Sequence, residues 1–201
     1  MTTALHCMES TPDVEIDSKG YVFNAAGTLI GSWRWDASQL DKSLHSILIK
    51  LKEESTNSGR AYWGPYTSST SNAWEGATTS PIGASVCMLG ANTGAHCGGI
   101  VKRNNFLVFH GPAQLDNMVE AEHATMALAG NGDSGGPVAR TVNGATGLAG
   151  FILGAPPAAS SAAECGTAMY IPIAQGTECS KTVWYTGGVA STMDELGVDL
   201  R

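Results

Sequence analysis

Short apolar runs recur along the chain between stretches rich in Gly, Ser, Thr, Asn and Pro. Runs of this kind, bounded by turn residues, are typical of antiparallel strands. They predict strands at residues 21–23, 28–33, 46–51, 84–88, 106–109, 147–153 and 168–173. The stretch from Ser55 to Ser80 is polar and has little hydrophobic periodicity, which favours a connector between two β-rich halves. We therefore expect two domains, residues 1–75 and 76–201, with a boundary near residue 76.

Helical patterns are scarce in this sequence. Only the segment from Ser191 to Leu196 offers Ser and Thr cap candidates, with Asp194 and Glu195 in the first turn. Charged residues make up 14% of the 201 residues, and small residues dominate, which suits short strands and tight turns. The pattern predicts an all-β protein with a short C-terminal helix.

Charge and hydropathy exclude two kinds of partner. The formal net charge is −7 and the Lys and Arg residues are not clustered, which argues against a surface that binds nucleic acid. The longest weakly polar stretch, Gly147 to Ala159, is interrupted by Gly154, Pro156 and Pro157, and it is shorter than the roughly 20 apolar residues that span a bilayer. We expect neither nucleic acid nor a membrane as a partner.

The five cysteines, residues 7, 87, 97, 165 and 179, form no CxxC pair. This pattern disfavours a closed zinc site and favours disulfides in an oxidising compartment. The five histidines show neither an i, i+4 pair nor the HExxH spacing of a metal site. We expect a secreted protein without metal or cofactor, and we expect any signal peptide to lie outside this chain, because the N-terminus lacks a basic segment followed by an apolar one.

One segment, residues 130–138, carries more glycine than an ordinary turn requires. Four glycines and a proline surround the pair Asp133-Ser134. Glycine lets the backbone approach a ligand closely and adopt conformations closed to other residues. The amides of Gly132 and Ser134 could therefore converge on one point, as in an oxyanion hole.

Residues Gly132 to Pro137 read GDSGGP, and the segment resembles the signature around the nucleophile of chymotrypsin-like serine proteases. Residues Thr3 to Cys7 read TALHC and resemble the TAxHC segment that carries the general base of that family. The resemblance implies Ser134 as nucleophile and His6 as base. The GxSxG elbow of α/β-hydrolases, which the same loop satisfies, is excluded by chain order, because every histidine precedes Ser134.

Two further stretches resemble the actinobacterial, streptogrisin-type branch of the family: residues 83–98 and residues 165–173. The resemblance implies two six-stranded antiparallel β-barrels of the chymotrypsin type, the first carrying His6 and the second carrying Ser134 and the specificity pocket. It also implies a disulfide between Cys87 and Cys97, with His96 at the surface beside it. Leu128 falls where the branch has a half-cystine, so Cys165 must pair elsewhere, and Cys179 is one candidate.

The acid of the triad departs from the family pattern. The family usually has an Asp at the start of a strand of the type DxALLKL, and His45 occupies that position here. Two readings stay open: Asp41, four residues earlier, orients His6, or the acid is lost. The chain also reaches His6 without the strand pair that precedes the base in the family, so we expect the first barrel to be incomplete and Cys7 to lack its family partner.

The same resemblance predicts the pocket and the surroundings of Asp133. Leu128 stands six residues before the nucleophile, where an Asp would select basic side chains, so Leu128, Leu153, Gly154 and Ala155 predict an apolar slot for the P1 side chain. The family's equivalent of Asp133 is buried and ion-paired, and Lys102 and Arg103 are the candidate partners.

These observations predict a secreted, monomeric serine endopeptidase that cleaves polypeptides through an acyl-enzyme on Ser134 and prefers an apolar P1 residue. The alternative is a catalytically impaired homologue that binds peptides or is inert, which His45 and the short N-terminus would explain.

Overall fold

The computed structural model describes residues 2–4, 19–23, 26–34, 46–52, 59–65, 68–110, 113–156, 159–165 and 177–196. Strands dominate, and the prediction of an all-β protein with a short C-terminal helix is confirmed. The strands are β1 (Thr2–Ala4), β2 (Lys19–Phe23), β3 (Leu29–Arg34), β4 (Ser46–Leu51), β5 (Arg60–Tyr62), β6 (Ser71–Ala73), β7 (Ser85–Gly90), β8 (Gly94–His110), β9 (Ala113–Glu122), β10 (Ala129–Gly130), β11 (Pro137–Val142), β12 (Ala145–Gly154), β13 (Ser160–Ser161), β14 (Cys179–Ser180) and β15 (Thr182–Thr186). A 3₁₀ helix, η4 (Ala162–Cys165), and the helix α1 (Val189–Leu196) complete the described elements.

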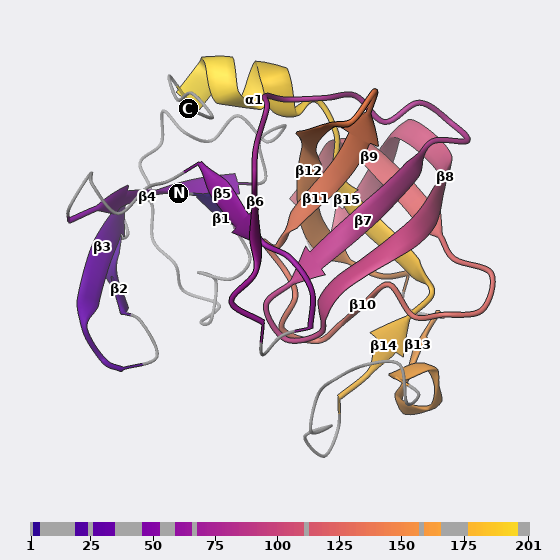
Figure 1. Cartoon of the computed structure of the whole chain (residues 1–201), viewed down its shortest axis with the longest axis horizontal. Helices are drawn as coiled ribbons and strands as arrows, with labels where there is room; N and C mark the ends of the chain where they lie inside the picture. The colour runs from indigo at the N-terminus through magenta and orange to yellow at the C-terminus, as the bar shows by residue number, and fades with distance from the viewer. Residues whose placement is uncertain are drawn as a thin grey trace.

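The C-terminal half forms a closed antiparallel barrel in the strand order β11–β12–β15–β9–β8–β7 (Figure 1). Strands β8 and β9 form a long hairpin in which Ile100 lies opposite Glu122 and Phe109 opposite Gln114. The register of this hairpin shifts near Arg103 and Phe106. Such β-bulges bend and twist a strand, which lets the hairpin wrap around the barrel.

Alternating side chains fill the barrel. On β7, Val86 and Met88 point into the barrel core and are buried. Ser85 is exposed and Cys87 is half-buried, because successive side chains of a strand point to opposite faces. Strand β12 is buried at every position from Gly147 to Leu153, because its second face is covered as well. The barrel core consists of Val86, Met88, Val101, Val119, Ala121, Leu128, Ala129, Val138, Ala149, Ile152, Val183 and Tyr185.

Helix α1 covers the outer face of β12. Val189 and Met193 lie one turn apart on the helix, and they pack against Leu148 and Phe151 of the strand. The helix starts two residues before the expected Ser191. Its docking explains why β12 reads as a continuous apolar run in the sequence.

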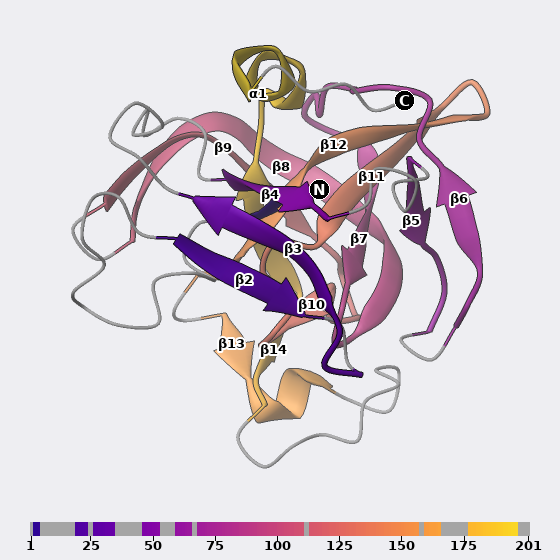
Figure 2. The same cartoon turned by 90° about the vertical axis from the view of Figure 1, so that its left-hand side faces the viewer.

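The N-terminal half contributes an antiparallel sheet in the order β1–β4–β3–β2, which lies beside the barrel (Figure 2). The expected connector between the halves is not free of strands, because β5 and β6 pair within it, with Arg60 opposite Ala73. Among the described residues the N-terminal strands form an open sheet. The first barrel and the boundary between 1–75 and 76–201 therefore stay predictions.

The expected strand at 168–173 lies outside the described residues and stays a prediction. The last strand of the barrel, β15, was not predicted. It pairs with β12 and with β9, where Trp184 lies opposite Glu120. The segment from Thr182 to Thr186 therefore completes the barrel, a role for which the sequence analysis did not single it out.

Candidate active site

The glycine-rich loop between β10 and β11 has a shape that its sequence requires. Gly132 and Gly135 have φ values of +89° and +80°, in the left-handed region that glycine adopts at little cost. A Cβ at Gly136 would lie 2.6 Å from the Leu89 carbonyl oxygen, so only glycine fits there. Main-chain hydrogen bonds join the loop to β12, from Gly135 N to Ile152 O (2.8 Å) and from Ile152 N to Gly136 O (2.8 Å).

Ser134 lies at the centre of this loop. Its hydroxyl donates a hydrogen bond of 3.1 Å to the main-chain carbonyl of Leu153. The serine and Gly132 both line a cavity of about 210 Å³. The lining consists of Ala129, Gly130, Asn131, Gly132, Ser134, Ile152, Gly154, Ala155, Ser160, Glu178, Ser180 and Val183. The structure thus places the predicted nucleophile on the wall of a hollow.

Two of the four residues predicted for the specificity pocket line this cavity, namely Gly154 and Ala155. Leu128 instead is fully buried in the barrel core, and the side chain of Leu153 packs with Met118 in a separate cluster. Successive side chains of a strand point to opposite faces, and the Leu153 side chain points away from the cavity. Its main-chain carbonyl contacts Ser134.

Polar groups replace the two leucines around the cavity. Ser160 and Ser180 come from the small sheet β10–β14–β13, which sequence reasoning missed because each of its strands has only two residues, and Glu178 immediately precedes β14. Glu178 is exposed, and its main-chain N–H donates to the side-chain oxygen of Asn131 (2.8 Å).

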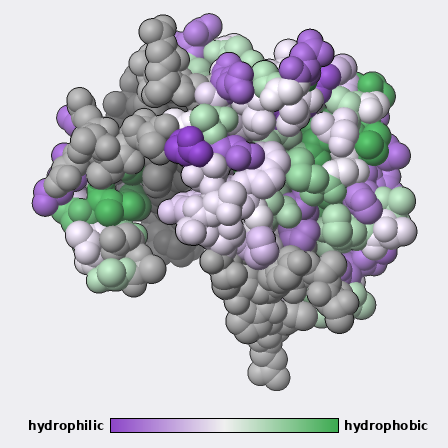
Figure 3. Space-filling view, viewed as in Figure 1, coloured by the Kyte–Doolittle hydropathy of each residue, from purple (hydrophilic) through white to green (hydrophobic). Residues whose placement is uncertain are grey.

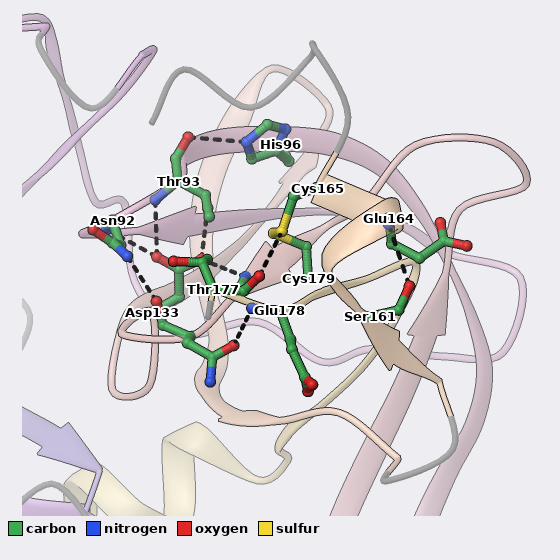
Figure 4. Close-up of a disulfide and its surroundings, with 12 residues drawn as sticks. Asn92, Thr93, His96, Asp133, Ser161, Glu164, Cys165, Thr177, Glu178 and Cys179 are labelled. Atoms are coloured by element: carbon green, nitrogen blue, oxygen red, sulfur yellow. Dashed lines mark hydrogen bonds between the residues drawn. A yellow bond between two sulfur atoms is a disulfide. The ribbon is translucent and has the colours of Figure 1, made fainter. Parts of the chain in front are cut away.

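Asp133 is fully buried next to Ser134 in the sequence and accepts hydrogen bonds from neutral donors (Figure 4). Its Oδ1 accepts hydrogen bonds from the main-chain N–H groups of Asn92 (2.8 Å) and Thr93 (3.0 Å). Its Oδ2 accepts from the Thr93 hydroxyl (2.6 Å) and from Gly130 N (2.8 Å). Hydrogen bonds of this number stabilise a buried carboxylate without a counter-charge.

The expected ion pair of Asp133 is wrong for both candidates. Lys102 lies 3.9 Å from a carboxylate oxygen of Glu122, and Arg103 forms a 2.7 Å ion pair with Glu120. Both cations project from β8 into solvent, since their side chains are about half exposed. Asn92 and Thr93, in the turn between β7 and β8, donate hydrogen bonds to the Asp133 carboxylate, where we expected an ion pair with a cation.

Two disulfides flank this region. Cys87 and Cys97 are joined across the β7–β8 hairpin, which confirms the predicted pair. Cys165 is bonded to Cys179 of β14, next to Glu178 (Figure 4). His96 is buried rather than at the surface, and its Nε2 lies 3.0 Å from the Thr93 carbonyl oxygen. The Cys87–Cys97 disulfide therefore joins the two strands of the hairpin, and the contact between His96 and Thr93 restrains the turn that connects them.

Several predicted site residues lie outside the described residues: His6, Cys7, Asp41 and His45. Their roles stay predictions. Within the described part of the chain, no three His, Cys, Asp or Glu side chains gather as a metal site would require. No described helix is long and apolar enough to cross a membrane. On the face drawn in Figure 3, apolar residues form small, separate patches among polar ones.

Comparison with protein-family models found no match, and comparison with curated proteins found no similar sequence. Solved structures do match. A protease from Nocardiopsis aligns over 98% of this chain and 82% of its own, with a TM-score of 0.61 and 19% identity. Protease A from Thermobifida fusca aligns over 98% and 82%, with a TM-score of 0.60 and 16% identity. A glutamic-acid-specific serine protease that uses a histidine triad in substrate binding aligns over 100% and 85%, with a TM-score of 0.66 and 16% identity.

The chain has the chymotrypsin-type fold. The likeness to the Nocardiopsis and Thermobifida proteases fits the actinobacterial branch that the sequence motifs indicate. In this fold the closed barrel carries the glycine-rich loop and the cavity beside it, and the predicted nucleophile is part of the loop and lines the cavity.

Proposed function

We propose that this protein is a serine endopeptidase in which Ser134 forms an acyl-enzyme with its polypeptide substrate. The observation that carries the proposal is the position of the Ser134 side chain, in a loop of glycines with left-handed backbone and on the wall of a cavity. A loop of this kind presents main-chain N–H groups beside a nucleophile. The chymotrypsin-type fold supports the same function.

The reaction would follow the acyl-transfer scheme of this fold. Ser134 Oγ attacks the carbonyl carbon of the scissile peptide while its proton passes to His6. The oxyanion is stabilised by the amides of Gly132 and Ser134. The C–N bond then breaks, the amine leaves with the proton from His6, and water hydrolyses the ester in the reverse sequence of proton transfers. No metal or cofactor takes part in this scheme.

A fluorophosphonate probe tests the nucleophile directly. It should label the wild-type protein, and Ser134→Ala should abolish labelling. Ser160→Ala is the matched control, because Ser160 lines the same cavity but lies outside the glycine-rich loop. This variant should be labelled like the wild type. Labelling that survives Ser134→Ala, or its absence from the wild type, would contradict the proposal.

Two readings of the triad acid are separated by a pair of variants. If Asp41 orients His6, Asp41→Asn should lower kcat by about 10⁴, as loss of the triad carboxylate does, and His45→Asp should change little. If the acid is lost, His45→Asp should raise hydrolysis several hundredfold or more, up to about the 10⁴-fold that loss of the triad carboxylate costs. The second result would favour a peptide-binding, catalytically impaired homologue.

The P1 preference follows from the side chains that line the cavity. We propose an apolar P1 residue, as the sequence predicts, and among the apolar residues that line the cavity Ala155 lies outside the barrel core and supports this preference. The Glu178 carboxylate should repel an acidic P1 side chain. A peptide series differing only at P1 should therefore rank Leu and Phe above Glu. Fastest cleavage after Arg would contradict an apolar preference and assign the selection to Glu178.

We also propose that the protein is secreted and acts outside the cell. The two disulfides support it, since such bonds persist in oxidising compartments. We expect the protein to act as a monomer.

A further inference from the structure

The side chain of Asn92 contacts the loop that carries the nucleophile. Asn92 lies in the turn between β7 and β8, and its Nδ2 donates a hydrogen bond of 2.7 Å to the main-chain oxygen of Asn131. Its main-chain N–H donates to Oδ1 of Asp133 at 2.8 Å. One residue of the turn therefore contacts the loop on both sides of Gly132.

The hydrogen bond to Asn131 fixes the direction of another group. The carbonyl of Asn131 and the N–H of Gly132 belong to one peptide unit, and the described residues contain no cis peptide bond. In a trans peptide the C=O and the N–H point in opposite directions. A donor that holds the oxygen on the Asn92 side therefore turns the Gly132 N–H to the opposite side.

This peptide unit needs such a restraint. Gly132 has no Cβ, so rotation of the peptide plane next to it meets little steric resistance. Asn131 also forms two hydrogen bonds with Glu178, the residue before β14: Asn131 N donates to Glu178 O (3.0 Å) and Glu178 N donates to Asn131 Oδ1 (2.8 Å). Both bonds involve groups of Asn131 that precede the Asn131–Gly132 peptide, so they leave its plane free to rotate. The amide of Asn92 is packed closely there, because a Cβ at Gly132 would lie 3.3 Å from its Nδ2.

We propose that Asn92 is a positioning residue for the oxyanion hole, which it completes by setting the orientation of the Asn131–Gly132 peptide. The Gly132 N–H then donates to the oxyanion of the tetrahedral intermediate. Without Asn92 the peptide can rotate, and its oxygen can face the oxyanion instead, where it repels the developing charge. The inference rests on the proposed acyl-enzyme chemistry at Ser134.

Two variants of Asn92 test the role. Asn92→Ala removes the side-chain donor and keeps the main-chain N–H that binds Asp133. Asn92→Asp keeps the shape of the side chain and suits the turn, but its carboxylate cannot donate. The matched control is Asn104→Ala, since Asn104 also donates its side-chain amide to a main-chain carbonyl, that of Ser80 (3.2 Å), away from the cavity lining.

The readout is the affinity for a peptide aldehyde, whose adduct with Ser134 carries an oxyanion, compared with the affinity for the product peptide, which does not. Both Asn92 variants should weaken aldehyde binding and lower kcat in parallel by about tenfold to a hundredfold, somewhat less than complete removal of an oxyanion-hole donor. Affinity for the product peptide and KM should change less than twofold, and Asn104→Ala should match the wild type in every measurement.

Crystal structures of the variants provide a second readout that does not depend on activity. In the Asn92 variants the Asn131–Gly132 peptide should be rotated or present in two orientations, while Asn104→Ala should keep the wild-type peptide. Unchanged aldehyde affinity together with an unchanged peptide would overturn the role of Asn92. If the fluorophosphonate leaves the wild type unlabelled, the proposed function fails, and the peptide orientation still decides whether Asn92 restrains the loop.

Discussion

The hydroxyl of Thr93 should contribute measurably to the stability of the whole domain. Asp133 is fully buried, and the Thr93 hydroxyl is 2.6 Å from its Oδ2. Thr93→Val removes this donor and keeps the shape of the side chain. The main-chain donors of Asn92 and Thr93 stay in place, so the variant isolates a single hydrogen bond to a buried carboxylate.

The size of the effect follows from the charge of the acceptor. A hydrogen bond to a charged group contributes about 1.5–3 kcal/mol net, against about 1 kcal/mol for a neutral pair. Because Asp133 is out of contact with water, no solvent molecule replaces the lost donor directly, which places the expected loss at about 2–3 kcal/mol. For a protein of this size that loss lowers Tm by roughly 4–12 °C.

Denaturant unfolding followed by circular dichroism measures the loss as a shift of the midpoint at constant m-value. Thr186→Val is the control, because Thr186 is also buried and its hydroxyl accepts a hydrogen bond from Phe151 N (3.0 Å), a neutral pair. We expect the control to lose about 1 kcal/mol. A Thr93→Val variant no less stable than Thr186→Val would refute the view that neutral donors carry the buried charge of Asp133.

Three further predictions concern the barrel around the site. Burial raises the pKa of Tyr185 from 10 to about 12, so the folded state should lose about 1.4 kcal/mol per pH unit between these values as the unfolded chain ionises, and Tyr185→Phe should remove that loss in alkaline unfolding curves. The hydrogen bond from Arg103, with a further one from Trp184, holds the pKa of Glu120 below 4.5, so stability should fall as the pH drops through the folded-state pKa. Glu120→Gln should flatten that acid limb. A Cβ at Gly90 would overlap the Asp133 carboxylate, so Gly90→Ala should lower the free energy of unfolding by about 3 kcal/mol and slow fluorophosphonate labelling.

Continuous apolar runs predicted strands that are buried on both faces and also some with one exposed face, such as β2 and β7. Strand β12 is the clearest case, because the barrel core covers one face and α1 covers the other. Strand β9 was missed, since its polar residues, such as Glu120 and Glu122, alternate with buried ones. The middle of β8 was missed for the same reason, because Lys102 and Arg103 point into solvent there. A search for continuous apolar stretches misses strand segments in which charged residues on the exposed face interrupt the apolar ones.

The shape of the loop that carries Ser134 could be predicted from sequence because it is a local structure. Gly132 and Gly135 need their left-handed backbone wherever the loop occurs. The cavity could not be predicted in the same way. Its lining depends on which face of a strand each side chain takes, and Leu128 and Leu153 both point into apolar clusters. A difference of one position in a strand reverses that direction.

The surroundings of the loop show why its six-residue motif is not sufficient for an active site. Asn92 and Thr93 bind it from a turn about 40 positions earlier, and Glu178 binds it from the segment before β14, more than 40 positions later. These contacts depend on the tertiary fold, because β11 pairs with β7 on one side of the loop and β10 pairs with β14 on the other. In a relative with the same motif, the donors of the β7–β8 turn are therefore the residues to compare first. A turn that lacks a side-chain donor at position 92 would leave the Asn131–Gly132 peptide unrestrained, even with the serine and its glycines intact.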